Sequence, residues 1–290
     1  MKKSNIKIMS AVLTLTLSGS SFCLTSCGNF EKEDAKVEGC TFLGNTTNID
    51  KIFNKSNINY LISELKNYGV VCDYSEKLNS LEVSSIEGYD FSEMPDRFYT
   101  LFNDLLGYTS IDHLCCFSKE LAVSLDFSKL DLGTVKHLGL FGNDDTLNYV
   151  NNTPLSVESL CVLLDKSSLS TNKLNLNIQG IESVTILSGN FNVVELGNVS
   201  FTGTKESELI LSGVSITKNT SFNCNNVKIS LNGIIEDTMP LTDLRNVEFE
   251  YHDHDTEKVV SYNPNSSDID EIVGRIKSIN SIRTLKRENM

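Results

Sequence analysis

The sequence predicts a β-rich repeat fold, a solenoid of parallel β-strands with N-terminal helices and a C-terminal capping helix. Two observations favour this fold class. Between residues 110 and 262, pairs of apolar residues separated by one position recur at intervals of 18 to 25 residues, a period found in short-coil repeat proteins. Asn and Gly gather between these pairs, as at Gly142-Asn143 and Gly197-Asn198. Both residue types tolerate the left-handed backbone conformations that tight corners need.

The region before the repeats, residues 41–109, is expected to form an α/β cap. Ser56 suits a helix N-cap, and apolar residues at helical spacing then lead to Gly69, which predicts a helix over 56–69. Strands are expected around residues 70–72 and 81–83, where apolar residues cluster or alternate. Pro95 suits the first turn of a second helix, which the apolar spacing extends to Gly107.

The repeats themselves are predicted from seven apolar-x-apolar pairs. They are Leu114/Cys116, Leu138/Leu140, Leu160/Val162, Val184/Ile186, Leu209/Leu211, Val227/Ile229 and Val247/Phe249. Between them lie further alternating runs, such as Leu125/Phe127 and Leu174/Leu176/Ile178, which could form a second wall of strands. Pro264 ends the region, and residues 263–290 then carry an apolar stripe at helical spacing, which predicts an amphipathic helix that covers the last coil.

Two segments carry a family resemblance. The leucine-rich repeat core L-x-x-L-x-L is approximated in residues 135–140 and 157–162. Residues 110–251 therefore resemble a degenerate leucine-rich repeat solenoid. The asparagine ladder of that family is mostly absent, and Asn143 is the convincing candidate for it. An irregular parallel β-solenoid and an antiparallel sandwich stay open as alternatives, since each also places strands between regularly spaced turns.

The N-terminus has the pattern of an export signal. Lys2 and Lys3 precede the short apolar stretch 6–17, which is too short to span about 30 Å of hydrocarbon. Leu24-Thr25-Ser26-Cys27 resembles the bacterial lipobox. The resemblance implies removal of the signal peptide 1–26 and acylation of Cys27, with residues 27–40 as a lipidated tether. A secretory signal cut elsewhere is the alternative. Two or three acyl chains, at about 0.8 kcal/mol per buried methylene, would hold the protein at the membrane.

This resemblance predicts a location on the extracellular face of the cell membrane, or in the outer membrane or periplasm of a Gram-negative host. The chain has a formal net charge of −13, and residues 1–26 contain three lysines and no acidic residue, so the remainder is still more acidic. Such a chain repels nucleic acid and anionic headgroups. The expected partners are therefore the membrane, through the lipid on Cys27, and an extracellular protein or glycan.

A candidate binding wall follows from the strand period of two, because the residues that flank the apolar pairs point outward. Its predicted members are His113, Cys115, Phe117, His137, Phe141, Leu163 and Leu187. The two phenylalanines and two leucines would form an apolar patch, which is typical of a contact site. In the alternatives, the N-terminal helices cover this patch, or the inward and outward assignments are exchanged.

Metal and catalytic chemistry find little support. His113, Cys115 and His137 are zinc-type ligands, and Tyr251-His252-Asp253-His254-Asp255 holds two histidines, but neither group shows a complete ligand set. No metal, cofactor or catalytic residue is predicted. The chain contains no G-x-S-x-G, H-E-x-x-H or P-loop motif, so an enzyme is not expected.

The predicted function is that of a lipid-anchored surface binding or adhesion protein that contacts a protein or glycan. The alternatives are a β-solenoid carbohydrate-active enzyme and a structural envelope lipoprotein. Six cysteines besides Cys27 belong to the mature chain, and they permit disulfides outside the cytoplasm. They are Cys40, Cys72, Cys115, Cys116, Cys161 and Cys224.

Overall fold

The computed structural model describes residues 46–290 except 90–93, 189–192 and 289–290. The predicted signal peptide 1–26, the lipidation site Cys27 and the tether 27–40 lie outside the described residues. The chain divides into two units, Met1–Ser56 and Asn57–Met290, and the sheet belongs to the second.

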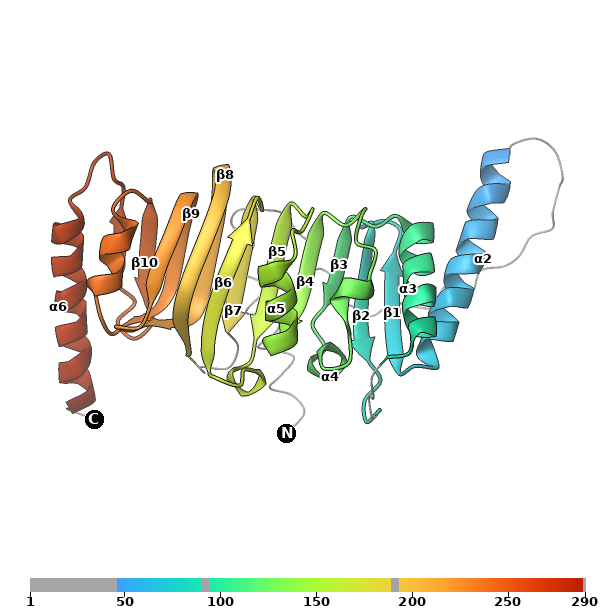
Figure 1. Ribbon diagram of the computed structural model, residues 1–290, viewed down its shortest axis with the longest axis horizontal. Helices are drawn as coiled ribbons and strands as arrows, with labels where there is room; N and C mark the ends of the chain where they lie inside the picture. The colour runs from blue at the N-terminus through green and yellow to red at the C-terminus, as the bar shows by residue number, and fades with distance from the viewer. Residues whose placement is uncertain (1–45, 90–93, 189–192, 289–290) are drawn as a thin grey trace. The chain divides into compact units, whose positions relative to one another are not determined.

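Eleven strands form one sheet, in the spatial order β1-β2-β3-β4-β5-β7-β8-β9-β10-β11, with β6 paired to β8 off this path (Figure 1). Among the described strands, only the pairs β1–β2 and β10–β11 are antiparallel. The strands are β1 (Val70–Ser75), β2 (Ser80–Ser85), β3 (His113–Cys116), β4 (His137–Gly142), β5 (Ser159–Leu164), β6 (Lys173–Gln179), β7 (Ser183–Ser188), β8 (Val194–Ile216), β9 (Ser221–Ile235), β10 (Phe249–Asp253) and β11 (Val259–Tyr262).

Helices are interspersed among the strands. They are α2 (Thr46–Lys66), α3 (Asp96–Thr109), α4 (Lys119–Ala122), α5 (Asp144–Asn152) and α6 (Ile269–Glu288), with 3₁₀ turns η1 (Phe127–Lys129), η2 (Lys166–Ser168) and η3 (Met239–Leu244). Helices α3, α4 and α5 each connect two neighbouring parallel strands. In Figure 1, α4 and α5 lie on the near face of the sheet.

The predicted solenoid, whether leucine-rich-repeat-like or irregular, is therefore wrong. The protein is a mixed α/β protein with a single, mostly parallel open sheet. The apolar pairs do mark parallel strands, but strands of an open parallel sheet have the same alternation and the same spacing of about 4.8 Å as the stacked strands of a solenoid. The connections differ, because helices of unequal length replace the corners of a repeated coil. Residues 125–127, expected as a strand, instead lead into η1.

The core begins with the first residue of each apolar pair. Leu114, Leu138, Leu160, Val184 and Leu209 are neighbours in successive ladders, and each is at most 2 % exposed. The next residues of this row are Ile229 and Phe249. The predicted pairs Val227/Ile229 and Val247/Phe249 had placed Val227 and Val247 in this row, so the observed register differs from the predicted one by two residues. A shift of two residues keeps every side chain on its face, so the apolar alternation alone could not detect it.

The longest strand, β8, takes part in three ladders, with β6, β7 and β9. The first half of β8 pairs with β6 and its second half with β7, and the register shifts between Thr202 and Ser207. A second shift lies at Gly213, whose φ of +71° is a conformation that favours glycine. Apolar residues of both ladders belong to one core, so the β6 ladder and the β7 ladder pack against the same interior.

Helices α3 and α6 both contribute to this core. Pro95 precedes α3, whose buried face includes Phe98, Leu101 and Leu105. Ile272, Ile276 and Ile279 of α6 are also core residues. The apolar stripe in the C-terminal sequence therefore packs on the end of the sheet that carries β10 and β11.

Candidate binding surface

The residues of the predicted wall lie on one face of the sheet, opposite the side that buries the apolar pairs. His113 and Cys115 are on β3, His137 and Phe141 on β4, Leu163 on β5 and Leu187 on β7, while Phe117 follows β3 directly. The ladders align them in columns, since His113 pairs with His137, and Phe141 with Leu163, which pairs with Leu187. We call this surface the histidine face.

Two imidazole rings stack on this face. The ring centroids of His113 and His137 are 4.2 Å apart and their planes differ by 13°. Their residues are paired in register on parallel strands, which brings equivalent side chains about one strand spacing apart. His137 Nδ1 lies 2.8 Å from the Oγ of Ser159, the next residue in the column. The histidine face therefore begins with an ordered polar row.

The environment of His113 disfavours its charged form. Burial lowers the pKa of His113, and His137 and Lys136 lower it further, while Asp112 acts in the opposite direction. A neutral imidazole can both donate and accept a hydrogen bond, whereas an imidazolium can only donate. Protonation of this row therefore changes both its charge and its hydrogen bonding.

On this face, the ring of Phe117 lies over Gly139. A Cβ atom at position 139 would come within 2.6 Å of the Phe117 ring. Cys115 and Cys161 flank Gly139 in the same column. Burial raises the pKa of the Cys161 thiol to about 11, so this thiol is protonated at neutral pH.

The apolar patch is smaller than the sequence suggested. Phe141 is only 6 % exposed and belongs with the buried residues. Phe117, Leu163 and Leu187 are partly exposed. In the column of Cys115, the structure places Ser230 and Glu250 beyond Ile210. The predicted pairs Val227/Ile229 and Val247/Phe249 would place Lys228 and Glu248 at these two positions. The two-residue shift of β9 and β10 accounts for this difference.

Metal ligands do not converge on this face. Among the residues that the structure describes, no three His, Cys, Asp or Glu side chains form a group that could hold a metal ion. His252 contacts Glu250 on β10, whereas His254 lies beyond the strand, with its Nδ1 3.4 Å from Asp255 Oδ1. Four of the described cysteines, Cys72, Cys116, Cys161 and Cys224, are free thiols.

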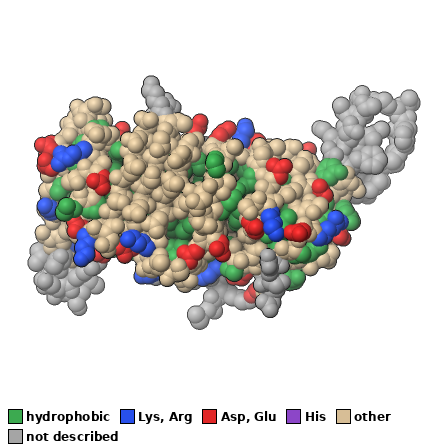
Figure 2. Space-filling model, in the orientation of Figure 1, with side chains coloured by type: hydrophobic (Ala, Val, Ile, Leu, Met, Phe, Trp, Pro, Cys, Tyr) green, Lys and Arg blue, Asp and Glu red, His purple; other side chains and the backbone are tan. Residues whose placement is uncertain are grey.

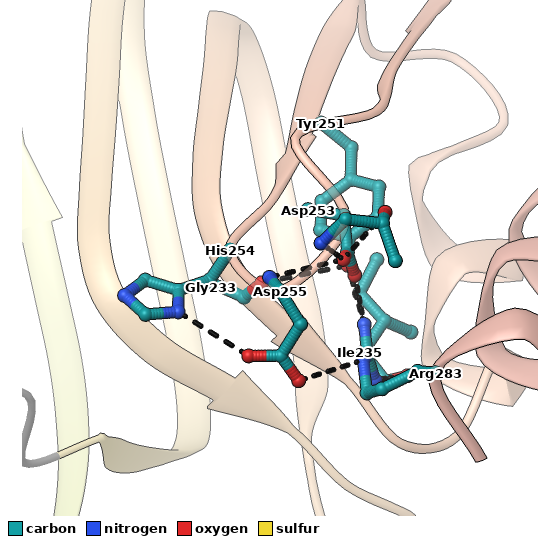
Figure 3. Close-up of polar contacts among 8 residues, drawn as sticks. Gly233, Ile235, Tyr251, Asp253, His254, Asp255 and Arg283 are labelled. Atoms are coloured by element: carbon teal, nitrogen blue, oxygen red, sulfur yellow. Dashed lines mark hydrogen bonds and ion pairs between the residues drawn. The ribbon is translucent and has the colours of Figure 1, made fainter. Parts of the chain in front are cut away.

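A buried polar cluster joins α6 to β10 (Figure 3). The Arg283 guanidinium forms an ion pair with Asp253, whose side chain is fully buried, and a second ion pair of 3.2 Å with Asp255. Arg283 also donates to the Tyr251 hydroxyl at 3.2 Å and to the Ile235 carbonyl at 3.4 Å. The arrangement stabilises the position of α6.

The other oxygen of Asp253 orders the turn that follows β10. It accepts hydrogen bonds from the backbone N–H of Asp255 at 3.1 Å and from the N–H and hydroxyl of Thr256, each at 2.8 Å. Tyr251 donates its hydroxyl proton to the first oxygen at 2.5 Å. Both oxygens of the Asp253 carboxylate are thus bonded to groups inside the protein, and the cluster has a structural role.

A row of polar side chains on the opposite surface was not predicted from the sequence. Asn151 of α5 donates to the Asn175 carbonyl at 3.0 Å and accepts from the Asn177 N–H at 2.7 Å. Asn175 Oδ1 accepts from the Asn198 N–H at 2.9 Å, and Asn198 Oδ1 accepts from the Ser221 hydroxyl at 2.8 Å. The spacing of 24 and 23 residues between these asparagines was the available signal.

Asn143, expected in an asparagine ladder, has a different role. Its side chain caps α5 by accepting from the Thr146 N–H at 2.8 Å, and it donates to the Ala122 carbonyl at 3.1 Å. It therefore connects α5 to the end of α4.

Of the helices that the structure describes, none combines the length and the apolar character needed to span a bilayer. Compared with known proteins, the chain matches no family model, no curated protein and no solved structure.

Proposed function

We propose that this chain is a lipid-anchored cell-surface binding protein whose histidine face contacts a partner protein. The observation that carries the proposal is the composition of this face. Phe117, Leu163 and Leu187 are partly exposed on the same face as the stacked pair His113–His137. Aromatic and aliphatic side chains with few charges at the centre are typical of protein interfaces.

The location rests on the sequence Leu24-Thr25-Ser26-Cys27 and the apolar stretch before it. Acyl chains on Cys27 would hold the protein at the membrane without a membrane-spanning helix. The net charge of −13 favours a partner that is not itself an anionic polymer.

Site-specific photo-crosslinking tests the contact. A photoreactive amino acid replaces Leu163 or Leu187 in the full chain, expressed in its native host, and replaces Met239 in the control. Met239 is apolar and 76 % exposed, but it lies in η3, away from the histidine face. We expect discrete protein adducts from positions 163 and 187 and not from 239. The same adducts from all three positions, or none from 163 and 187, would refute the proposal.

Acyl labelling tests the anchor. Cells that express the full chain are fed a fatty-acid probe, and the parent is compared with Cys27→Ala. We expect label and membrane association in the parent and loss of both in the variant. A Cys23→Ala variant, which removes the neighbouring cysteine, should keep the label. Equal labelling of the parent and Cys27→Ala would overturn the lipid anchor without bearing on the histidine face.

A further inference from the structure

A second surface of the molecule consists only of amide and hydroxyl side chains. It is formed by β6 and by the first halves of β8 and β9, whose ladders place Asn177 beside Ser200 and Asn223, and Gln179 beside Thr202 and Asn225. We call its nine residues the amide grid. They are Asn175, Asn177, Gln179, Asn198, Ser200, Thr202, Ser221, Asn223 and Asn225. All are exposed except Ser200, which is partly exposed.

The absence of charge from these nine positions is unusual for this chain, in which 22 % of residues are charged. Outward positions elsewhere in the sheet do carry charges, for example Asp73 on β1, Glu82 on β2 and Glu250 on β10. Figure 2 shows the grid as a broad area without charged or apolar side chains over β6, β8 and β9. The charged pair Lys173 and Glu195 lies at one border, paired in register at the start of the β6 ladder.

Strand pairing sets the register of the grid, with one irregularity between Leu174 and Leu176 where β6 pairs with β8. The strands lie side by side at about 4.8 Å, and alternate residues along each strand are about 7 Å apart. The hydrogen bonds of Asn151, Asn175 and Asn198 fix one row. The side chains of Gln179, Thr202 and Asn225 are exposed. A regular set of donors and acceptors therefore faces solvent, and the strand pairing sets the spacing of the residues that carry it.

We propose that the amide grid binds a neutral glycan. Amides and hydroxyls both donate and accept hydrogen bonds, which matches the hydroxyl groups of a sugar chain. The grid offers no positive charge for phosphate, sulfate or nucleic acid. It also lacks the apolar centre that a protein interface needs. An extended polymer fits better than a small ligand, because the polar groups of the grid repeat from strand to strand.

Each contact on such a surface is weak, so retention on a polymer depends on several contacts at once. This inference is independent of the proposed contact through the histidine face, since the two surfaces share no residue. It extends the proposed function from a partner protein to a second, carbohydrate ligand.

Polysaccharide depletion assays test the inference with the purified full-length chain in detergent. The probes are cellulose, chitin, mannan, starch and a β-1,3-glucan, with heparin and polygalacturonate as anionic polymers. The grid variant is Gln179→Ala/Thr202→Ala/Asn225→Ala. Its matched control, Asn246→Ala/Ser261→Ala/Asn265→Ala, removes two amides and one hydroxyl from exposed positions outside the grid. Thermal unfolding checks that both variants fold like the parent.

We expect the parent to bind at least one neutral polysaccharide, the grid variant to lose about tenfold or more in affinity, and the control to bind like the parent. No binding to any neutral polymer would overturn the proposal. So would equal losses in the two variants, or binding of the anionic polymers alone.

Discussion

The Arg283 guanidinium of α6 forms an ion pair with the fully buried carboxylate of Asp253 on β10. Thirty residues separate the two in the sequence, and the pair connects the last helix to the sheet. An ion pair removed from water stabilises a fold only when its remaining hydrogen bonds are made. Here Tyr251 and Thr256 supply them.

Removal of one partner should therefore be costly. Arg283→Met leaves the Asp253 carboxylate buried without a counter-charge, and we expect the free energy of unfolding to fall by about 3–5 kcal/mol. Arg245→Met is the matched control, because Arg245 pairs with Asp270 at 3.0 Å on the surface, where the side chains are 50 % and 70 % exposed. Its loss should be below about 1 kcal/mol. Urea unfolding measures both, and equal losses would show that burial does not determine the cost.

Gly139 and Phe117 are expected to be coupled. A Cβ at position 139 would meet the Phe117 ring, so Gly139→Ala should displace the ring and lower the free energy of unfolding by about 1–3 kcal/mol. In a Phe117→Ala background the same substitution should cost little. A double-mutant cycle in urea measures the coupling energy. Gly274→Ala in α6, where a Cβ meets no atom within 4 Å, should instead be neutral or stabilising. Additive effects of the changes at 139 and 117 would contradict the ring position.

Local sequence patterns predicted the strands but not their connections. The register from β3 to β7 follows from the apolar pairs, because alternation determines which side chains are buried. The same pairs occur in a solenoid and in an open parallel sheet, so they could not separate the two. The helix α5 was missed because Asn143 was interpreted as a ladder residue, whereas its side chain caps this helix.

For the candidate surfaces too, the sequence predicted some features and not others. The proximity of His113 to His137 was expected from their equivalent places in adjacent strands. The burial of Phe141 was not, since the alternation puts it on the outward side while its side chain is 6 % exposed. The cluster around Arg283 depends on how α6 is rotated against β10, which the helical stripe alone does not specify. The amide grid has no apolar or charged signal, and only the strand pairing brings its rows together.

The buried thiols predict a loss of stability at alkaline pH. Burial raises the pKa of Cys72 and of Cys116 from 9.0 to about 12 in each case. Above pH 9 the unfolded chain therefore loses these protons while the folded chain keeps them, so stability is complete below pH 9 and falls as pH rises towards 12. At pH 10.5 we expect a loss on the order of 1–2 kcal/mol per thiol.

Urea unfolding at pH 7.5 and 10.5 measures this loss, and the comparison with Cys72→Ala/Cys116→Ala separates it from the titration of lysines and tyrosines. The difference between the two pH values should be smaller in the variant. An identical pH dependence in parent and variant would show that the two thiols do not titrate as burial requires.

The histidine pair predicts a shifted titration. Because burial, His137 and Lys136 lower the pKa of His113, its NMR titration midpoint should lie below the ordinary value of about 6.5. The unfolded chain then takes up a proton at higher pH than the folded chain, so this residue stabilises the fold above pH 6.5 and the contribution is lost as pH falls. His137→Gln should raise the midpoint only in part, since burial is the largest cause. His254→Gln, remote from the pair, should leave it unchanged. If the titration midpoint of His113 is the same in the parent and in His137→Gln, the stacked rings are not electrostatically coupled. The histidine face would then respond to pH through burial alone.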